Sequence, residues 1–253
     1  MKIGLALGAG AAKGLAHLGV LSVLEEENIP IHCIAGSSMG SIVGGFYAAG
    51  LELDRMIKLA CNLKWGFLTD FTIPQRGFIG GRRLLQFFRL LSKGYYIEDL
   101  PIPYAAVATD IENGEEVQIK KGPLAEALRA SSSIPGIYQP FYHQGRWLVD
   151  GGVLNRVPCS AVQKMGAEYV IAVNIEFAQD ESRVQSIYDI IFKTYEIMGK
   201  EILKGKIIDA DLVISPAVGH ISAMQIQKAK ECIELGEKAA RDAISLMPTE
   251  FNF

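Results

Sequence analysis

Two short apolar runs, each followed by a glycine-rich turn and a helical pattern, constrain the fold more than any other feature. "KIGLAL" precedes "GAGAAKG", and "IHCIAG" precedes "SSMGSIVGG". Apolar residues then recur at helical spacing from Ala12 to Asn28, before Pro30, and from Met39 to Ala49, before Gly50. A strand-helix-strand-helix start of this kind predicts a parallel sheet flanked by helices.

The rest of the chain extends this α/β pattern. Helical spacing continues over residues 53–63, 82–93, 123–133, 182–204 and 223–246. Strands are predicted in "YAAVATDI" and "EEVQIK", joined by a hairpin at Asn113 and Gly114, and in "RWLVDGG", "EYVIAVNI" and "ADLVIS". No repeat or linker interrupts the 253 residues, so one α/β domain over residues 1–253 is expected.

Composition excludes several classes of function. The net charge is −3, whereas a general nucleic-acid binder is usually basic. The four cysteines are scattered without a C-x-x-C pair, which disfavours a zinc site and is typical of buried thiols in a reducing compartment. We find neither a signal-peptide pattern nor an apolar run of roughly 18 residues. The sequence therefore predicts a cytoplasmic protein.

The first glycine-rich turn resembles a nucleotide-binding loop only superficially. A Rossmann fingerprint would need glycine where Lys13 stands, and Gly8, Gly10 and Gly14 follow a looser spacing. The Walker pattern is also absent, because Gly14 follows Lys13. Backbone N–H groups at such a helix start bind a phosphate or a tetrahedral oxyanion equally well. Close packing of helix on strand is the alternative interpretation.

The second turn contains G-x-S-x-G, from Gly36 to Gly40. The middle residue, Ser38, follows a strand and precedes a helix, which is the context of a nucleophile elbow. The alternative is an ordinary helix N-cap. Consecutive βα units usually place their strands side by side, so the first glycine turn is expected beside Ser38, where it would supply oxyanion donors.

A nucleophilic serine needs a base. The candidates among the histidines are His17, His32, His143 and His220. We expect His17 at a helix surface or packing edge and His32 at the far end of its strand; His220 follows Asp150 in the order of a histidine triad. Asp150 is the stronger candidate, because it directly follows an apolar strand and precedes Gly151 and Gly152. A partly buried aspartate can take the serine proton directly.

Together these motifs resemble the patatin-like phospholipases over residues 1–175. The matching residues are Lys13 and Gly14 after the glycine turn, Gly36 to Gly40, and Asp150 with Gly151 and Gly152. "ASSSIPGIYQPF" and "VATDIENGEEV" are similar to further blocks of that family. The resemblance implies a three-layer α/β sandwich with a mostly parallel central sheet. It also implies hydrolysis of a lipid or fatty-acyl ester without metal ion or cofactor.

By position, the resemblance makes Ser38 the nucleophile and Asp150 the general base. The N–H groups of Gly10, Ala11 and Ala12 would form the oxyanion hole, and Lys13 would fix the loop. The family commonly has consecutive glycines here, and alanine disfavours positive φ. A differently shaped hole, or a non-catalytic regulator or acyl-binding scaffold, is therefore the alternative to a full enzyme.

The segment 78–96 carries large apolar residues beside Arg82, Arg83, Arg89 and Lys93. Such a pattern predicts either an acyl-chain lid or peripheral contact with a membrane. The alternative is a core helix with a solvated basic face.

Overall fold

A mostly parallel sheet forms the centre of the molecule. The computed structural model describes residues 1–73, 75–175, 184, 186–204 and 209–246. The sheet has eight strands, and seven of them follow one another in the order β10-β9-β1-β2-β4-β8-β7, with β5 paired to β4. Their bounds are β1 Ile3–Leu7, β2 Cys33–Ser37, β4 Tyr104–Asp110, β5 Glu115–Ile119, β7 Phe141–His143, β8 Arg146–Asp150, β9 Tyr169–Val173 and β10 Leu212–Ile214.

Strand direction divides the sheet into two parts. The strands from β10 to β4 are parallel, whereas β5 and β8 each run antiparallel to β4, and β7 runs antiparallel to β8. The strands β1, β2, β4 and β9 are buried along their whole length, as expected of parallel strands covered on both faces. The carboxyl ends of β1 and β2 lie side by side, as the sequence predicts.

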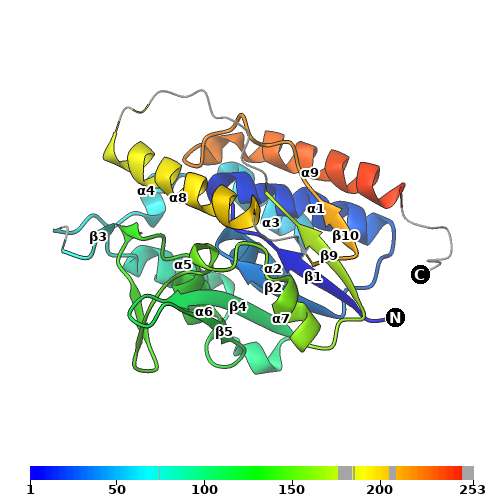
Figure 1. Ribbon diagram of the computed structural model, residues 1–253, viewed down its shortest axis with the longest axis horizontal. Coiled ribbons are helices and arrows are strands. Elements are labelled where there is room, and N and C mark those ends of the chain that lie inside the picture. Colours follow the sequence, from blue (N-terminus) through cyan, green and yellow to red (C-terminus); the bar gives the residue numbers. More distant parts are fainter. Residues whose placement is uncertain (74, 176–183, 185, 205–208, 247–253) are drawn as a thin grey trace.

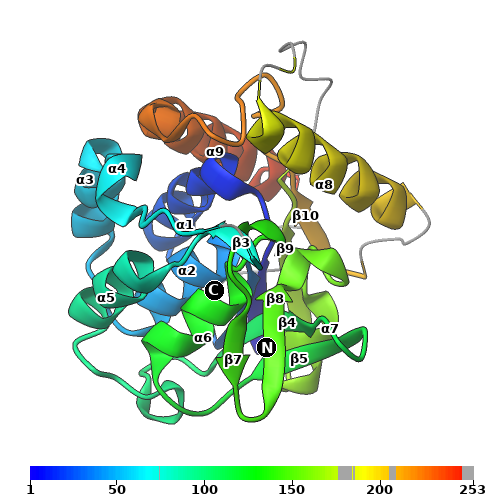
Figure 2. The same ribbon diagram turned by 90° about the vertical axis from the view of Figure 1, so that its left-hand side faces the viewer.

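Helices cover both faces of the sheet (Figures 1 and 2). On one face the core contains Leu5, Leu7 and Ile34 together with apolar residues of several helices. The opposite face carries Ala6, Cys33 and Val170, packed with residues of one short helix, α7. The predicted three-layer α/β arrangement is therefore confirmed, with a thick layer on one side and a thin one on the other.

The helices agree with the periodicity of the sequence, with shorter ends. The helices predicted from the sequence correspond to α2 (Met39–Ala48), α3 (Leu53–Asn62), α5 (Arg82–Leu91), α6 (Leu124–Ser131), α8 (Ile187–Lys204) and α9 (Ala229–Ile244). Two short helices are additional, α4 (Trp65–Leu68) and α7 (Cys159–Lys164). Part of the start expected for α8, at 182, lies outside the described residues.

Local deviations from the expected elements occur near the glycine loop and near segment 78–96. The helix expected from Ala12 begins as a 3₁₀ turn, η1 (Ala11–Leu15), and continues as α1 (Ala16–Glu26). Residues 77–79 belong to no strand or helix expected from the sequence, and they form β3 (Gly77–Ile79), which pairs in parallel with β6 (Gly136–Tyr138) outside the main sheet. Short strands of this kind carry too little periodicity to be recognised from sequence.

Candidate active site

Ser38 lies on a sharp turn between β2 and α2. Its backbone has φ 55° and ψ −124°, a conformation that non-glycine residues rarely adopt. Although Ser38 precedes the helix, its side chain makes no capping hydrogen bond to α2. The ordinary N-cap interpretation therefore fails, because the hydroxyl is not engaged by the helix.

The turn is held by a serine from another helix. The N–H of Ser38 donates to Ser131 Oγ at 3.1 Å, and Ser131 Oγ donates to the carbonyl of Val107 at 2.5 Å. Ser131 is fully buried at the end of α6, so this relay ties the elbow to β4. The geometry of Ser38 is thus supported by tertiary contacts as well as by the local sequence.

The glycines around Ser38 allow the elbow and the first glycine loop to touch. A Cβ at Gly36 would collide with the carbonyl of Gly40, and a Cβ at Gly40 would collide with the carbonyl of Leu7, at the end of β1. A Cβ at Gly14 would lie 2.6 Å from that of Met39, closer than two such atoms approach. The predicted proximity of the glycine loop and the elbow is confirmed.

Asp150 occupies the carboxyl end of β8 and is fully buried. Its Oδ1 accepts hydrogen bonds from the N–H of Gly152 at 2.8 Å and from the hydroxyl of Tyr195 at 2.7 Å. Its Oδ2 has no well-aligned partner among the described residues. One carboxylate oxygen is therefore fixed by the protein, while the other is left for Ser38.

The electrostatics of Asp150 suit a base. Burial raises the pKa of this carboxyl above its usual value, and the Ser38 hydroxyl, the Tyr195 hydroxyl, the Gly152 N–H and the Arg156 charge oppose that rise. The Ser38 hydroxyl is thus close enough to influence the Asp150 carboxyl, although Oδ2 makes no well-aligned hydrogen bond to a described residue. Catalytic pairs commonly look like this without substrate.

The two glycines after Asp150 make room for its neighbours. A Cβ at Gly151 would collide with the carbonyl of Val107, and a Cβ at Gly152 would collide with the Tyr195 hydroxyl and lie 2.7 Å from Ala9 Cβ. The D-G-G motif thus brings the end of β8 against the glycine loop and against α8. Larger residues at either position would displace Asp150.

The glycine loop offers two of the three N–H groups expected for an oxyanion hole. The N–H of Ala12 donates to the carbonyl of Ala223 at 3.1 Å, so it is already engaged. Gly10 and Ala11 precede or begin η1, where N–H groups lack an intrahelical acceptor. Ala11 also lines the same cavity as Ser38. Gly10 and Ala11 therefore remain the candidates for the oxyanion hole, which stays a prediction.

Ala11 itself adopts the backbone conformation that alanine disfavours, with φ 46°. The loop is kept in place by backbone bonds on both sides, from the N–H of Gly8 to the Val173 carbonyl at 3.0 Å and from the N–H of Ala9 to the Arg156 carbonyl at 2.8 Å. Ala11 therefore carries backbone strain within the loop.

Lys13 is fully buried, and its Nζ lies 2.7 Å from Oε1 of Glu196 on α8. A buried ammonium needs a nearby anion, so this ion pair anchors the glycine loop to α8. The expectation that Lys13 fixes the loop fits this contact.

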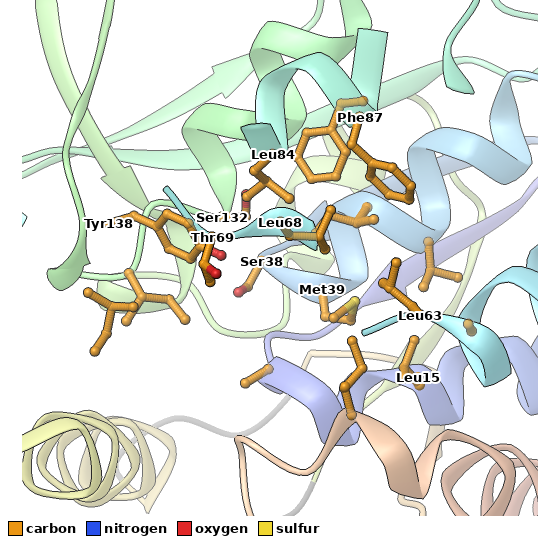
Figure 3. A pocket seen from close by; sticks show the side chains of 18 of the residues that line it. Leu15, Ser38, Met39, Leu63, Leu68, Thr69, Leu84, Phe87, Ser132 and Tyr138 are labelled. Atoms are coloured by element: carbon orange, nitrogen blue, oxygen red, sulfur yellow. The ribbon is translucent and has the colours of Figure 1, made fainter. Parts of the chain in front are cut away.

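An apolar cavity of about 440 Å³ opens beside Ser38 (Figure 3). Its walls come from α2, α3, α5, α8 and the connections between them. Figure 3 shows Ser38 within the lining, with Tyr138 on one side and Met39, Leu63 and Leu15 on the other. A cavity of this size and character suits a flexible hydrocarbon group.

Helix α5 forms one wall of this cavity. Leu84 and Phe88 are buried, and both line the cavity together with Phe87 and Leu91. Arg82, by contrast, is 90% exposed. Helix α5 is thus packed through Leu84 and Phe88 and has a solvated basic face, while a lid or membrane contact of segment 78–96 stays a prediction.

Comparison with known proteins identifies the family to which the chain belongs. A family model described as "Patatin-like phospholipase" matches residues 5–162. The chain belongs to this family. The match covers most of residues 1–175, where the resemblance was expected, whereas a single patatin-like domain over residues 1–253 stays a prediction.

Relatives share this patatin-like region. An uncharacterised NTE family protein of Mycobacterium bovis is 42% identical over 177 residues, which cover 69% of this chain and 49% of that protein. Lysophospholipase NTE1 of Saccharomyces cerevisiae is 34% identical over 192 residues, covering 72% of this chain and 11% of that protein. The aligned region therefore spans about half of the mycobacterial relative and a small part of the yeast one.

Two solved structures share the fold. The crystal structure of VipD from Legionella pneumophila has a TM-score of 0.64 at 13% identity, over 96% of this chain and 66% of that one. The type III effector protein ExoU gives a TM-score of 0.57 at 13% identity, over 96% of this chain and 53% of that one. At such identities the likeness concerns the fold alone.

None of the four histidines, all of which the structure describes, forms a hydrogen bond with Ser38 or Asp150. His17 is fully buried rather than at a surface, and its Nε2 lies 2.8 Å from the Gly8 carbonyl. Burial lowers the pKa of His17 to about 4, so it is neutral near pH 7. The Nδ1 of His32 accepts from the N–H of Ile3, His143 lies beside Glu126, and the exposed His220 lies 2.7 Å from Glu231.

The sequence did not predict contacts of three side chains near Ser38 and Asp150: Ser131, Arg156 and Tyr195. Arg156 is buried, donates to the Ala9 carbonyl at 3.4 Å, and places its guanidinium 5.4 Å from the centre of the Tyr195 ring. Arg156 follows the D-G-G motif closely, which is a usable signal. A tyrosine inside a long amphipathic helix gives none, because tyrosines at such positions usually only pack.

Two further features of the described residues bear on cofactors and membranes. They include no group of three or more His, Cys, Asp or Glu side chains that could hold a metal ion. Within the same residues, no helix combines the length and apolar character needed to cross a bilayer.

Proposed function

We propose that this protein is a serine hydrolase of fatty-acyl esters that uses a Ser38–Asp150 dyad. The observation that carries the proposal is the position of Ser38. Its hydroxyl lies on a strained elbow, next to a buried carboxylate and in the wall of an apolar cavity. Membership of the patatin-like phospholipase family supports the same activity.

In the first step, Ser38 Oγ attacks the ester carbonyl carbon while its proton passes to Asp150 Oδ2. The N–H groups of Gly10 and Ala11 stabilise the negative oxygen of the tetrahedral intermediate. When the intermediate collapses, the alcohol leaves and takes the proton from Asp150. The acyl group remains on Ser38 as an ester.

In the second step, Asp150 takes a proton from water, and the resulting hydroxide attacks the acyl ester. Ser38 Oγ then leaves and recovers the proton from Asp150, which releases the fatty acid. The raised pKa of Asp150 makes its carboxylate a stronger base than a solvated aspartate. Tyr195 and Gly152 hold Oδ1 and leave Oδ2 to move the proton.

The substrate class follows from the cavity. Its lining is almost wholly apolar and includes Ser38. The acyl chain would lie along Met39 toward Leu63, while the polar alcohol part stays outside. The yeast relative is named a lysophospholipase. A lysophospholipid, with one chain and a polar headgroup, is therefore our preferred natural substrate.

Labelling with a fluorophosphonate probe, combined with turnover of p-nitrophenyl esters, tests the mechanism. Wild type should label and turn over; Ser38→Ala should lose both, and Asp150→Asn should slow both strongly. Ser245 is an exposed serine at the C-terminal end of α9. Its variant Ser245→Ala serves as the control and should behave as wild type. Equal labelling of wild type and Ser38→Ala would refute the nucleophile.

A non-catalytic acyl-binding protein is the second candidate. The engaged N–H of Ala12 and the strained Ala11 favour it, since an incomplete oxyanion hole slows acyl transfer. In that case a fluorescent fatty acid would bind wild type and Ser38→Ala equally, and the probe would label neither.

A further inference from the structure

Three large apolar side chains are turned to solvent on one short stretch. We call residues 64–73 the rim segment. Within it, Phe67 is 73% exposed, Phe71 is 74% exposed and Ile73 is 79% exposed. Single exposed apolar residues are ordinary, but three within seven residues mark an interaction surface.

The same segment also borders the acyl cavity. Gly66, Leu68, Thr69 and Phe71 line the cavity that contains Ser38, and Figure 3 shows Leu68 and Thr69 close to Ser38. The rim segment therefore has one side in the cavity and the other in solvent. Whatever binds its outer side lies next to the cavity.

Contacts with β3 and α5 hold the rim segment in this position. Asp70 Oδ1 accepts from the N–H of Gly81 at 2.9 Å, and Arg83 donates to the Thr69 carbonyl at 3.0 Å. The N–H of Thr72 donates to the Phe78 carbonyl at 3.0 Å. The exposure of the apolar side chains is thus built into the fold, and Figure 1 shows this α4–β3 region at one end of the molecule.

Charge around the rim segment favours an anionic partner. Residues 64–83 contain four basic residues and one acid, in a chain of net charge −3. The acid, Asp70, is engaged with the backbone at the start of α5. The basic residues are exposed: Lys64, Arg76, Arg82 and Arg83. Apolar tips beside cations match the headgroup region of an anionic bilayer.

We propose that the rim segment docks the protein on an anionic lipid bilayer. Phe67, Phe71 and Ile73 insert at the level of the headgroups, and Arg82 with its basic neighbours contacts lipid phosphates. A lipid can then pass from the bilayer into the cavity beside Ser38 without crossing water. The role of this docking, delivery of a lipid to Ser38, rests on the proposed function. Vesicle binding itself can be measured whether or not the protein hydrolyses esters.

The surface differs from the one expected from sequence. Segment 78–96 was the candidate for membrane contact, and its helix α5 turns Leu84 and Phe88 inward but leaves Leu90 76% exposed. Its basic N-terminal end contributes charge, and the preceding residues contribute the apolar side chains. The contact thus moves to the rim segment, with Arg82 and Arg83 as the shared part.

Vesicle co-sedimentation tests the proposal. We would use vesicles of pure phosphatidylcholine and of equal parts phosphatidylcholine and phosphatidylglycerol. All proteins carry Ser38→Ala, so that the lipids stay intact. Binding should be strong only with phosphatidylglycerol. Phe67→Ser with Ile73→Ser should weaken it tenfold or more, since both side chains lose apolar burial. Arg82→Gln should weaken it about fivefold.

Matched controls come from α9 and the residue after its C-cap, outside the rim segment. Leu246→Ser removes an apolar side chain that is 83% exposed, and Lys230→Gln removes an exposed charge on α9; both should bind as the parent. Absent vesicle binding, or equal binding by the Phe67→Ser/Ile73→Ser variant, would overturn the proposal. A dimer that this variant abolishes, without vesicle binding, would instead assign the surface to a second copy.

Turnover of a soluble short-chain ester, measured with Ser38 restored, separates this inference from the proposed function. The Phe67→Ser/Ile73→Ser variant should retain that turnover, because a soluble ester needs no bilayer. If wild type lacks turnover but binds vesicles, the proposed function fails and the docking surface stands. If it turns over esters but ignores vesicles, only the docking surface fails.

Discussion

The strained backbone of Ser38 makes a quantitative prediction about stability. Its φ of 55° and ψ of −124° coincide with the first central position of a type II′ turn, which glycine adopts without steric cost. Replacing Ser38 by alanine keeps a Cβ and hence the strain. Replacing it by glycine removes both, so the two variants differ mainly in backbone strain.

The expected difference follows from two opposing contributions. A non-glycine residue in such a region costs about 1–3 kcal/mol, whereas glycine loses about 0.5–1 kcal/mol more than alanine through its unfolded-state freedom. Ser38→Gly should therefore be about 1 kcal/mol more stable than Ser38→Ala. For a chain of this size that corresponds to about 2–4 °C in melting temperature.

Urea and thermal unfolding of both variants measure the difference directly. Ser245, at the end of α9, has φ −61° and ψ −19°, and its alanine and glycine variants form the control pair. There glycine should be less stable than alanine by up to about 1 kcal/mol. If Ser38→Gly were likewise less stable than Ser38→Ala, the elbow would not be strained and our account of its geometry would be wrong.

Three further predictions concern the surroundings of the dyad. Tyr195→Phe removes a hydrogen bond that lowers the pKa of Asp150; because only the ionised carboxylate accepts the Ser38 proton, the acidic limb of kcat/KM should move to higher pH. Leu63→Trp shortens the cavity and should lower kcat/KM for long-chain against short-chain esters about tenfold, since each excluded methylene is worth about 0.8 kcal/mol. Glu196→Gln weakens the compensation of the buried Lys13 charge and should cost roughly 3 kcal/mol in urea unfolding.

Each of these predictions has a distinguishing control. Tyr142→Phe, at an exposed tyrosine on β7, should leave the pH profile unchanged, and an unchanged profile for Tyr195→Phe as well would argue against its role. Equal losses for short and long esters in Leu63→Trp would indicate general damage rather than a shorter cavity. Glu234→Gln, in an exposed i,i+4 pair with Lys230, should alter stability by less than about 0.5 kcal/mol.

The sheet centre and the positions of Ser38 and Asp150 at strand ends were predictable because local sequence dictates them. A buried strand followed by glycine and a helix has few solutions, so β1, β2 and the turn at Ser38 follow from spacing alone. Asp150 was recognisable because two glycines mark the end of its strand. In both places the backbone needs residues without a Cβ, and this requirement is visible in the sequence.

Other parts of the site depend on contacts that local sequence does not specify. His17 has the spacing of a helix surface, but the glycine loop and its carbonyl at Gly8 enclose it. The N–H of Ala12 is engaged because a distant loop presents the carbonyl of Ala223. The exposure of the rim segment could not be predicted, because its apolar residues follow neither a helical nor a strand period. Each depends on how distant segments pack together.

Two neighbouring residues of helix α8, Tyr195 and Glu196, make contacts with the candidate site that the sequence did not indicate. Tyr195 holds the carboxylate of Asp150, and the next residue, Glu196, holds Lys13 of the glycine loop. A displacement of α8 would therefore disturb the base and the oxyanion donors together. The family match ends at residue 162, so both residues lie beyond it. We infer that the matched region supplies the reacting groups, while the reactivity of this particular dyad is set by a helix outside that region. Replacing α8 by an unrelated helix should then leave Ser38 in place. It should suppress fluorophosphonate labelling more than Tyr195→Phe or Glu196→Gln alone.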